Sequence, residues 1–301
     1  MARSILNITD LSSDDLLEVL ALAEKPIESL GLPLKGKGAA LIFEKPSNRT
    51  RHSMEMAVVQ LGGHPVYTRG EEIGFDTREP VEDVAAIMSG YHALLCARVF
   101  KHSAVERLAV SASVPVINML SDVSHPLQGL ADVLTMRQEL GDLRGRTVAW
   151  VGDWNNVALS LAEASAYLGM NFRIAAPKGY QATQQELDRI GSLGAADVVQ
   201  FESPDEGVAG ADVVHTDVWT SMGQESENVK RMEAFAGYTV TESMMSKAAA
   251  GALFMHCLPA HRGEEVSAEV VDGTRSRVVQ QGHNRMHSAR GAIAFLMGVR
   301  A

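Results

Sequence analysis

Cysteine is scarce in this sequence, and long apolar runs are missing from it. Its two cysteines are Cys96 and Cys257, so no disulfide framework can be argued and a reducing cytoplasm fits best. No segment approaches the roughly 20 apolar residues that span a bilayer. Residues 1–4 lead into polar positions without an apolar core, so we expect neither a signal peptide nor an association with membranes.

Excess positive charge and glycine-rich loops are also missing. The formal net charge is −10, which argues against general binding to nucleic acid. An anionic ligand would need a local basic pocket in this acidic protein. No segment of the sequence matches the glycine-rich phosphate-binding pattern of P-loop proteins. A dinucleotide fold needs Gly-x-Gly-x-x-Gly after a strand, but residues 152–156 read Gly-Asp-Trp-Asn-Asn, which argues against a nucleotide-dependent dehydrogenase.

What the sequence does contain is an alternation of short apolar runs with longer amphipathic segments. We expect strands at residues 39–43, 93–96, 114–120, 147–151, 172–176, 212–216 and 252–256. Helical spacing lies between them, for example at residues 51–61, 81–91, 127–140 and 157–168. Strands that alternate with helices predict βαβ units, and hence mainly parallel sheets flanked by helices.

The length and this pattern predict an α/β protein of two lobes. A chain of 301 residues is a soft prior for two domains. The clearest pause is Gly-Asp-Leu-Arg-Gly at residues 141–145, and the helix before it could bridge the lobes. We expect a first domain of residues 1–133, with the amphipathic residues 285–301 packing back on it. Residues 134–284 would form the second, with the active site in the cleft between the lobes.

The first expected strand ends at Phe43 and leads into a polar loop, residues 44–51, which reads Glu-Lys-Pro-Ser-Asn-Arg-Thr-Arg. Pro46 stops the strand, and Ser47 is suited to cap the helix that follows. A helix N-terminus presents free N–H groups, and Arg49 adds a planar guanidinium that can hold phosphate through two hydrogen bonds. The loop therefore predicts an anion site, although a capped helix with surface arginines would look the same.

Four later strands also end in polar residues. They lead into Arg98, Ser-Asp-Val-Ser-His-Pro-Leu-Gln at 121–128, Asp-Val-Trp-Thr-Ser-Met-Gly at 217–223 and His-Cys-Leu-Pro at 256–259. Taken alone, Cys257 would more commonly be a buried, inert thiol. His256, Cys257 and His261 could also be metal ligands. We reject a metal because neighbours on a strand point to opposite faces, and because we see no second ligand cluster.

Taken in order, these segments resemble the ornithine carbamoyltransferase family. Its markers are a Ser-Thr-Arg-Thr-Arg loop, an arginine after the third strand, His-Pro-x-Gln, Asp-x-x-x-Ser-Met-Gly and His-Cys-Leu-Pro, and the likeness extends from Phe43 to about Met286. Asn48 stands where the family usually has Thr, and it can still donate to a phosphate. Trp154 stands where a small Gly is usual, which would place a large ring near the expected ornithine site.

The resemblance implies transfer of the carbamoyl group of carbamoyl phosphate to the δ-amine of ornithine, giving citrulline and phosphate in arginine metabolism. The first domain would bind carbamoyl phosphate and the second ornithine. Four residues would grip the phosphate: Ser47, Asn48, Arg49 and Thr50. Five would act at the carbamoyl group: Arg98, His125, Gln128, Arg285 and the backbone of Leu258. Arg98 would bridge the phosphate and the carbonyl oxygen, His125 would donate to that oxygen, and Gln128 would accept from the carbamoyl nitrogen.

On the acceptor side, the resemblance implies five ornithine-binding residues: Asn156, Asp217, Ser221, Met222 and Cys257. Asp217 would hold the α-amino group, and Cys257 would contact the side chain. The catalytic set would be Arg98, His125, Cys257 and Arg285. No cofactor or metal is implied, and the assembly would be a homotrimer. The polar segment 221–235 would be a loop that closes over bound ornithine.

Several of these residues have a purely structural alternative. His125 could cap a carbonyl at a His-Pro turn, and Asp217 could cap a helix or form a surface ion pair. Asn155 and Asn156 could form a turn after a strand. Arg285 could be a surface charge at a helix N-terminus. Against the first alternative, Gln128 follows His125 at the spacing of one helical turn.

Other functions would need a different set of residues. Aspartate carbamoyltransferases share the first two markers but read an acceptor rich in carboxylates. Putrescine carbamoyltransferases lack Ser-Met-Gly, so Asp217 with residues 221–223 favours an amino-acid acceptor, and putrescine or a modified ornithine is the alternative. A non-catalytic anion-binding α/β protein would have no need of His125, Gln128, Asp217 and Cys257 together.

Overall fold

The computed structural model of the chain describes residues 2–194, 197–220 and 225–301. The chain folds into two compact units. Unit 1 comprises residues 1–134 and 283–301, and unit 2 comprises residues 135–282. Two helices continue from one unit into the other, namely α6 (Pro126–Leu140) and α13 (Val278–Leu296). In the part of the chain that is described, no helix is both long and apolar enough to cross a membrane.

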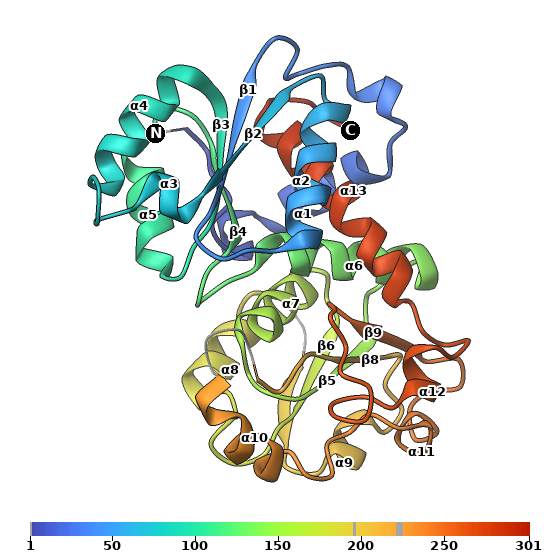
Figure 1. The fold of residues 1–301 in the computed structure, drawn as a ribbon. Coiled ribbons are helices and arrows are strands. Elements are labelled where there is room, and N and C mark those ends of the chain that lie inside the picture. Colours follow the sequence, from blue (N-terminus) through green and yellow to red (C-terminus); the bar gives the residue numbers. More distant parts are fainter. Residues whose placement is uncertain (1, 195–196, 221–224) are drawn as a thin grey trace. The chain divides into compact units, whose positions relative to one another are not determined.

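Unit 1 is built on a parallel sheet. Its described strands are β1 (Gly38–Phe43), β2 (His64–Arg69), β3 (His92–Arg98) and β4 (Val116–Leu120), in the order β2-β1-β3-β4 (Figure 1). β1 and β3 are apolar and almost wholly buried, as expected for strands covered on both faces. β2 lies at an edge of the sheet and is only partly buried.

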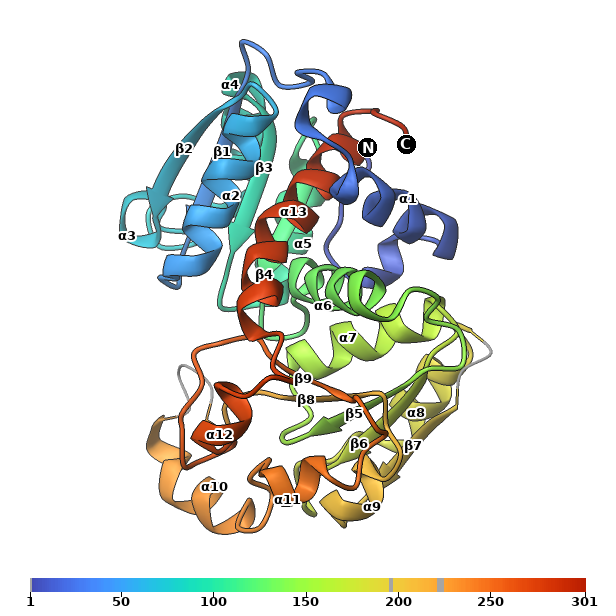
Figure 2. The same ribbon diagram turned by 90° about the vertical axis from the view of Figure 1, so that its right-hand side faces the viewer.

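The helical and 3-10 segments of unit 1 connect these strands. They are η1 (Ile8–Asp10), α1 (Ser13–Glu24), η2 (Ile27–Leu30), α2 (Asn48–Gln60), α3 (Gly70–Ile73), α4 (Val81–Tyr91) and α5 (His102–Ser111), with parts of α6 and α13. Side chains alternate between the faces of a strand. Ala40 and Ile42 of β1 therefore pack with α4 and α5 in one apolar cluster, and α2 and α13 lie on the opposite face (Figures 1 and 2).

Unit 2 contains a second parallel sheet. Its described strands are β5 (Thr147–Val151), β6 (Asn171–Ala175), β7 (Val198–Phe201), β8 (Val213–Thr216) and β9 (Leu253–His256), in the order β7-β6-β5-β8-β9. The helical segments are α7 (Asn156–Tyr167), α8 (Gln184–Gly191), α9 (Pro204–Val208), η3 (Glu225–Glu227), α10 (Asn228–Ala234), α11 (Glu242–Met245) and α12 (Ala268–Val271). α9, α11 and α12 lie on one face and α7 on the other (Figure 2).

Each sheet has one point at which the strand order reverses. In unit 1 the chain moves outward from β1 to β2 and later outward from β3 to β4, so the reversal lies between β1 and β3. In unit 2 it lies between β5 and β8. Ligands of open α/β sheets bind at the carboxyl ends of strands beside such a reversal. The residues that follow β1, β3, β5 and β8 are therefore the places to look for a site.

Candidate active site

The loop after β1 has the form of an anion site. Ser47 caps α2, because its hydroxyl oxygen accepts a hydrogen bond from the Thr50 backbone N–H at 3.4 Å, as the sequence predicted. The first intrahelical bond runs from the Arg51 N–H to the Ser47 carbonyl at 3.0 Å, so the N–H groups of Asn48 and Arg49 precede the helical ladder. Asn48 is exposed and Arg49 is half-buried.

The Thr50 hydroxyl is oriented by its neighbours. Its oxygen accepts from Arg285 Nη2 at 2.7 Å and from the Ser47 hydroxyl at 3.0 Å. A hydroxyl oxygen has two lone pairs, so with both engaged the Thr50 proton remains as a donor in another direction. A buried hydroxyl held in this way is suited to donate to an anion at the α2 N-terminus.

Arg98 is the last residue of β3, at the reversal point of the sheet, and its side chain is buried. The Glu44 N–H donates to the Arg98 carbonyl at 2.9 Å, which ties the carboxyl ends of β1 and β3 together. Lys45 adds a cation that the sequence analysis missed. Its ammonium lies 4.8 Å from the Phe100 ring centroid, and burial, followed by repulsion from Arg98, lowers the pKa of Lys45.

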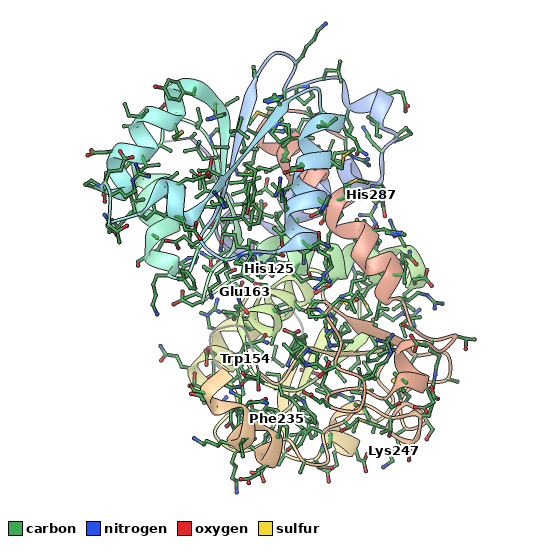
Figure 3. The ribbon with its side chains drawn as sticks, in the orientation of Figure 1. His125, Trp154, Glu163, Phe235, Lys247 and His287 are labelled. Atoms are coloured by element: carbon green, nitrogen blue, oxygen red, sulfur yellow. The ribbon has the colours of Figure 1, made fainter. Side chains whose placement is uncertain are left out.

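His125 directly precedes α6 (Figure 3), and Gln128 lies in the first turn of that helix. Both side chains are buried. Burial lowers the pKa of His125 well below its usual value, and the positive charges of Arg285 and Arg98 lower it further. The imidazole is therefore neutral near pH 7 and offers one N–H donor. Electrostatic interaction with both arginines places His125 in the same cationic cluster.

Arg285 joins these segments. Its Nη1 donates to Gln128 Oε1 and its Nη2 donates to the Thr50 hydroxyl. The side chain is buried and lies in the second turn of α13, so the alternative of a surface charge at a helix N-terminus is wrong. Unit 1 thus brings together six predicted residues, which we call the unit 1 site: Ser47, Thr50, Arg98, His125, Gln128 and Arg285.

A second group lies at the reversal point of unit 2. Asp217 follows β8 and is buried. One carboxylate oxygen, Oδ1, accepts from the Cys257 thiol at 2.9 Å and from the Val218 N–H at 2.8 Å, and Oδ2 accepts from Asn155 Nδ2 at 3.1 Å. Asp217 is therefore not a surface ion pair. We call Asn155, Asp217 and Cys257 the unit 2 site.

Asn155, the neighbour of the predicted ornithine-binding residue Asn156, contacts Asp217. Asn155 caps α7, because its Oδ1 accepts from the N–H groups of Val157 and Ala158 at 3.0 Å each. This leaves its Nδ2 to donate to Asp217. Asn156 is half-buried and begins α7, and its binding role stays a prediction. The cap preference of asparagine just before a helix could have singled out Asn155.

The turn after β9 is shaped by two buried residues, His256 and Glu265. The Leu258 N–H donates to His256 Nδ1 at 2.8 Å, so the ring proton lies on Nε2, which is 3.0 Å from Glu265 Oε1. Leu258 itself has a φ of 60°, a backbone region that few bulky residues adopt. The backbone contact predicted for Leu258 stays a prediction.

Comparison with protein families matches both units. Residues 3–138 match the family model of the aspartate/ornithine carbamoyltransferase carbamoyl-P binding domain, and residues 144–296 match that of the Asp/Orn binding domain. The chain belongs to the aspartate/ornithine carbamoyltransferase family.

Individual members of this carbamoyltransferase family are similar over nearly the whole chain. The ornithine carbamoyltransferase of Thermus thermophilus is 44% identical, with 99% of this chain and 97% of the relative covered. The structure of ornithine carbamoyltransferase from Pyrococcus furiosus has a TM-score of 0.93 at 39% identity, over 99% of this chain and 97% of that one. A structure of N-acetyl-L-ornithine transcarbamylase has a TM-score of 0.88 at 28% identity, with 97% and 99% covered.

Two features of this carbamoyltransferase needed the structure to interpret. Trp154 (Figure 3) departs from the family's usual Gly. Its indole Nε1 donates to Glu186 Oε1 of α8 at 3.1 Å. The ring is thus held by α8, which the expectation of a ring near the ornithine site did not foresee. The Ser-Met-Gly marker, with the predicted Ser221 and Met222, lies outside the described residues. The expected loop at 221–235 is in part helical, since η3 and α10 occupy residues 225–234.

Both structural reasons for expecting no metal in this carbamoyltransferase are wrong, although the expectation itself stays a prediction. Potential ligand atoms of Asp217, His256 and Cys257 lie within 4.8 Å of one another. His256 is the last residue of β9, so strand alternation does not extend to Cys257. A second cluster also exists, since His261, Glu264 and Glu265 meet the same distance criterion.

Proposed function

We propose that the protein transfers the carbamoyl group of carbamoyl phosphate to the δ-amine of L-ornithine, giving L-citrulline and phosphate. The observation that carries the proposal is a division of charge between the two sites. The unit 1 site is cationic, because the charges of Arg98 and Arg285 both act on His125. Its residues other than Arg285 lie in the region matching the carbamoyl-P binding model, and Arg285 donates to Thr50 in the first turn of α2. The unit 2 site centres on the carboxylate of Asp217 and lies in the region matching the Asp/Orn binding model.

Phosphate binding is proposed for the α2 loop. Carbamoyl phosphate carries about two negative charges near neutral pH, by analogy with phosphate monoesters. Ser47, Asn48, Arg49 and Thr50 would hold the phosphate oxygens through hydroxyl, amide and guanidinium donors at the positive end of α2. The orientation of the Thr50 hydroxyl supports this role, because both of its lone pairs are already engaged by protein donors.

Charge stabilisation is proposed for Arg98, His125 and Arg285. When the amine nitrogen attacks the carbonyl carbon, negative charge develops on the carbonyl oxygen. Arg98 would bridge that oxygen and the phosphate, and His125 would donate its single N–H to the same oxygen. One such donor is typically worth ~3 kcal/mol of barrier. Gln128 and the Leu258 carbonyl would accept from the carbamoyl nitrogen, and Arg285 would hold Gln128 in place.

The acceptor must lose its charge before it can attack. A lysine-like amine has a pKa near 10.4, so deprotonation at pH 7 costs ~4–5 kcal/mol in water, and a desolvated site lowers this cost. We propose that Asp217 holds the α-amino group and that Cys257 contacts the side chain, with Asn156, Ser221 and Met222 completing the site. The C–O bond to phosphate then breaks, one amine proton leaves with the phosphate and one passes to solvent.

Further properties are proposed from the sequence. The resemblance implies a homotrimer and a place in arginine metabolism, and two free cysteines suit a reducing cytoplasm. Residues 1–133 with 285–301 would form the carbamoyl phosphate-binding domain, residues 134–284 would form the ornithine-binding domain, and segment 221–235 would close on the acceptor. Light scattering after size exclusion tests the trimer.

An acceptor panel tests the reaction. Purified protein is given carbamoyl phosphate with ornithine, N-acetylornithine, putrescine or aspartate, and the ureido product is measured. We expect rapid product with ornithine and little with the other three, because Asp217 and the Ser-Met-Gly marker favour an acceptor with a free α-amino group. Turnover of putrescine or N-acetylornithine that matches ornithine would overturn the assignment of the acceptor.

A further inference from the structure

A buried carboxylate lies behind the unit 1 site and has no part in the proposed reaction. Asp132 is on α6, one helical turn after Gln128, and is fully buried. Its Oδ1 accepts a hydrogen bond from Gln128 Nε2 at 2.7 Å. Burial of a carboxylate is costly unless strong hydrogen bonds or opposite charges compensate for the lost water. A purely apolar side chain would avoid this cost, which suggests that the charge has a task.

The direction of every hydrogen bond along this row of residues is fixed by chemistry. An ionised carboxylate can only accept, and a guanidinium can only donate. Gln128 lies between the two, with Nε2 toward Asp132 and Oε1 accepting from Arg285 Nη1. If the amide turned over, its NH₂ group would face the Arg285 donors and its oxygen would face the carboxylate. Asp132 therefore excludes one of the two amide orientations.

The effect of Asp132 extends beyond Gln128. Arg285 donates with its Nη1 to the Gln128 oxygen and with its Nη2 to the Thr50 hydroxyl. The guanidinium is planar and rigid, so two fixed acceptors determine its plane. The Gln128 oxygen is one of these acceptors, and Asp132 determines where that oxygen points. The carboxylate thus helps to orient the group that is proposed to reach the carbamoyl moiety.

We infer that Asp132 is a positioning residue for the carbamoyl end of carbamoyl phosphate. It holds the Gln128 amide and, through it, the Arg285 guanidinium in the orientation that receives the carbamoyl group. This inference rests on the proposed function and deepens it. The phosphate end is assigned to the α2 loop, which this row of hydrogen bonds reaches at Thr50, its far end from Asp132. Loss of Asp132 should therefore affect recognition of the carbamoyl group more than recognition of phosphate.

A simple structural role makes a different prediction. Hydrogen bonds between side chains four residues apart also stabilise helices, and a carboxylate that only supported α6 would affect folding or both ligands alike. The ratio of affinities for carbamoyl phosphate and inorganic phosphate distinguishes the two roles. Inorganic phosphate lacks the carbamoyl group but presents the same charge and oxygens to the loop.

The first experiment measures both affinities by calorimetry for the wild-type protein, Asp132→Asn and a control, Asp212→Asn. The Asp132→Asn amide keeps the volume but can donate as well as accept, so it no longer excludes the wrong Gln128 orientation. We expect its Kd for carbamoyl phosphate to rise about 10- to 100-fold, with the Kd for phosphate changing less than about threefold. Asp212 accepts from Arg146 and Thr147 at the amino end of β8, so Asp212→Asn should leave both affinities unchanged.

A second pair of variants keeps the test valid if Asp132→Asn folds poorly. In Gln128→Glu two carboxylates face each other, whereas in the double variant Gln128→Glu, Asp132→Asn the new Asn can donate to the new Glu, which still accepts from Arg285. We expect the double variant to have at least about tenfold higher kcat/KM for carbamoyl phosphate than Gln128→Glu alone. A double variant no better than Gln128→Glu, or equal loss of both affinities in Asp132→Asn, would overturn the inference.

The wild-type protein separates this inference from the proposed function. If the wild type neither binds carbamoyl phosphate nor forms citrulline, the proposed function fails. If it does both and Asp132→Asn shows the same affinity ratio as the wild type, only the role of Asp132 fails.

Discussion

The Cys257 thiol donates to Asp217 Oδ1 at 2.9 Å, although the two residues follow different strands, β9 and β8. The thiol is half-buried, and the carboxylate also accepts from Asn155 and Val218. The oxygens of this side chain, at the end of the sheet, are thus directed by neutral donors. The contact between thiol and carboxylate is therefore the part of the unit 2 site that a single substitution can examine.

Substitution of Cys257 should separate the hydrogen bond from the sulfur itself. Cys257→Ser keeps an O–H donor for Asp217, whereas Cys257→Ala leaves that carboxylate oxygen without it. We expect Cys257→Ala to raise the KM for ornithine about 10-fold or more and Cys257→Ser to raise it less, with the KM for carbamoyl phosphate nearly constant in both. Steady-state kinetics with each substrate varied in turn measures this. Equal KM changes for the two substrates would contradict the assignment.

His125 should act as a neutral donor and should reduce stability in acid. Burial and the two arginines hold its pKa well below the usual value, so stability is fully present above about pH 6.5 and is lost as pH falls below the unfolded-state pKa. His125→Gln should lower kcat about 100- to 1,000-fold. The apparent pKa on the acidic side of the pH–rate profile should stay the same as in the wild type. Urea unfolding at pH 7.5 and 5.5 should show a smaller loss for His125→Gln than for the wild type, and His261→Gln is the exposed control.

We expect Arg231 to affect the binding of ornithine but not that of carbamoyl phosphate. Its Nη1 donates to Asp153 Oδ2 at 2.7 Å and to the Trp219 carbonyl at 3.0 Å, so it ties the turn that carries Asn155 to the segment that carries Asp217. The Nε of Arg231 also donates to Glu227 Oε2 at 3.0 Å, and a lysine ammonium cannot reach all three acceptors in the geometry of the planar guanidinium. We expect Arg231→Lys to raise the KM for ornithine about 10-fold and to leave the KM for carbamoyl phosphate unchanged.

The control for Arg231 is Arg262→Lys. Arg262 pairs with an exposed carboxylate, Asp272, and such surface pairs contribute little. Wild-type kinetics in Arg262→Lys and a selective acceptor effect in Arg231→Lys are the expected pattern. A fall in kcat/KM for carbamoyl phosphate of the same size in Arg231→Lys would show that it disturbs more than the acceptor turns.

Helix α13 contains a glycine that close packing requires. A Cβ at Gly291 would lie 2.5 Å from the Val19 carbonyl oxygen and 2.9 Å from the Ala23 backbone N of α1, and backbone atoms cannot move aside as a side-chain end can. Gly291→Ala should therefore lower the free energy of unfolding by about 1–3 kcal/mol. Gly282 lies in the same helix with nothing within 4 Å of such a Cβ. Gly282→Ala should raise the free energy of unfolding by about 0.5–1 kcal/mol. Denaturant unfolding measures the change in each variant.

The fold was largely predictable because parallel strands that are buried on both faces consist of nearly continuous apolar residues. All seven expected strands are present, and the α/β class with two parallel sheets is confirmed. The strands β2 and β7 were missed for one physical reason. Both lie at sheet edges and neither contains a fully buried residue, so His64–Arg69 and Val198–Phe201 carry no apolar run that marks a strand.

Part of the candidate site was predictable from sequence, namely the polar and charged residues that stand at the ends of expected strands. Family resemblance supplied Arg98, His125 and Asp217, whose binding roles stay predictions, and the structure adds that each is buried. Asp132 could not be inferred in the same way. It sits inside a helix, and only the packed structure shows that its carboxylate accepts from Gln128. The metal argument failed for a different reason. The strand end at His256 was expected correctly, but strand alternation was applied beyond it to Cys257.

Carbamoyl transfer is tested most directly by following the carbon atom. The protein is mixed with ¹³C-carbamoyl phosphate and ornithine, and the ¹³C NMR signal and the released phosphate are recorded together. The account predicts that the label moves to the ureido carbon of citrulline with one phosphate released for each citrulline, and that Arg98→Ala slows both signals together. Label that appears only in bicarbonate, at the same rate with and without ornithine, would contradict it.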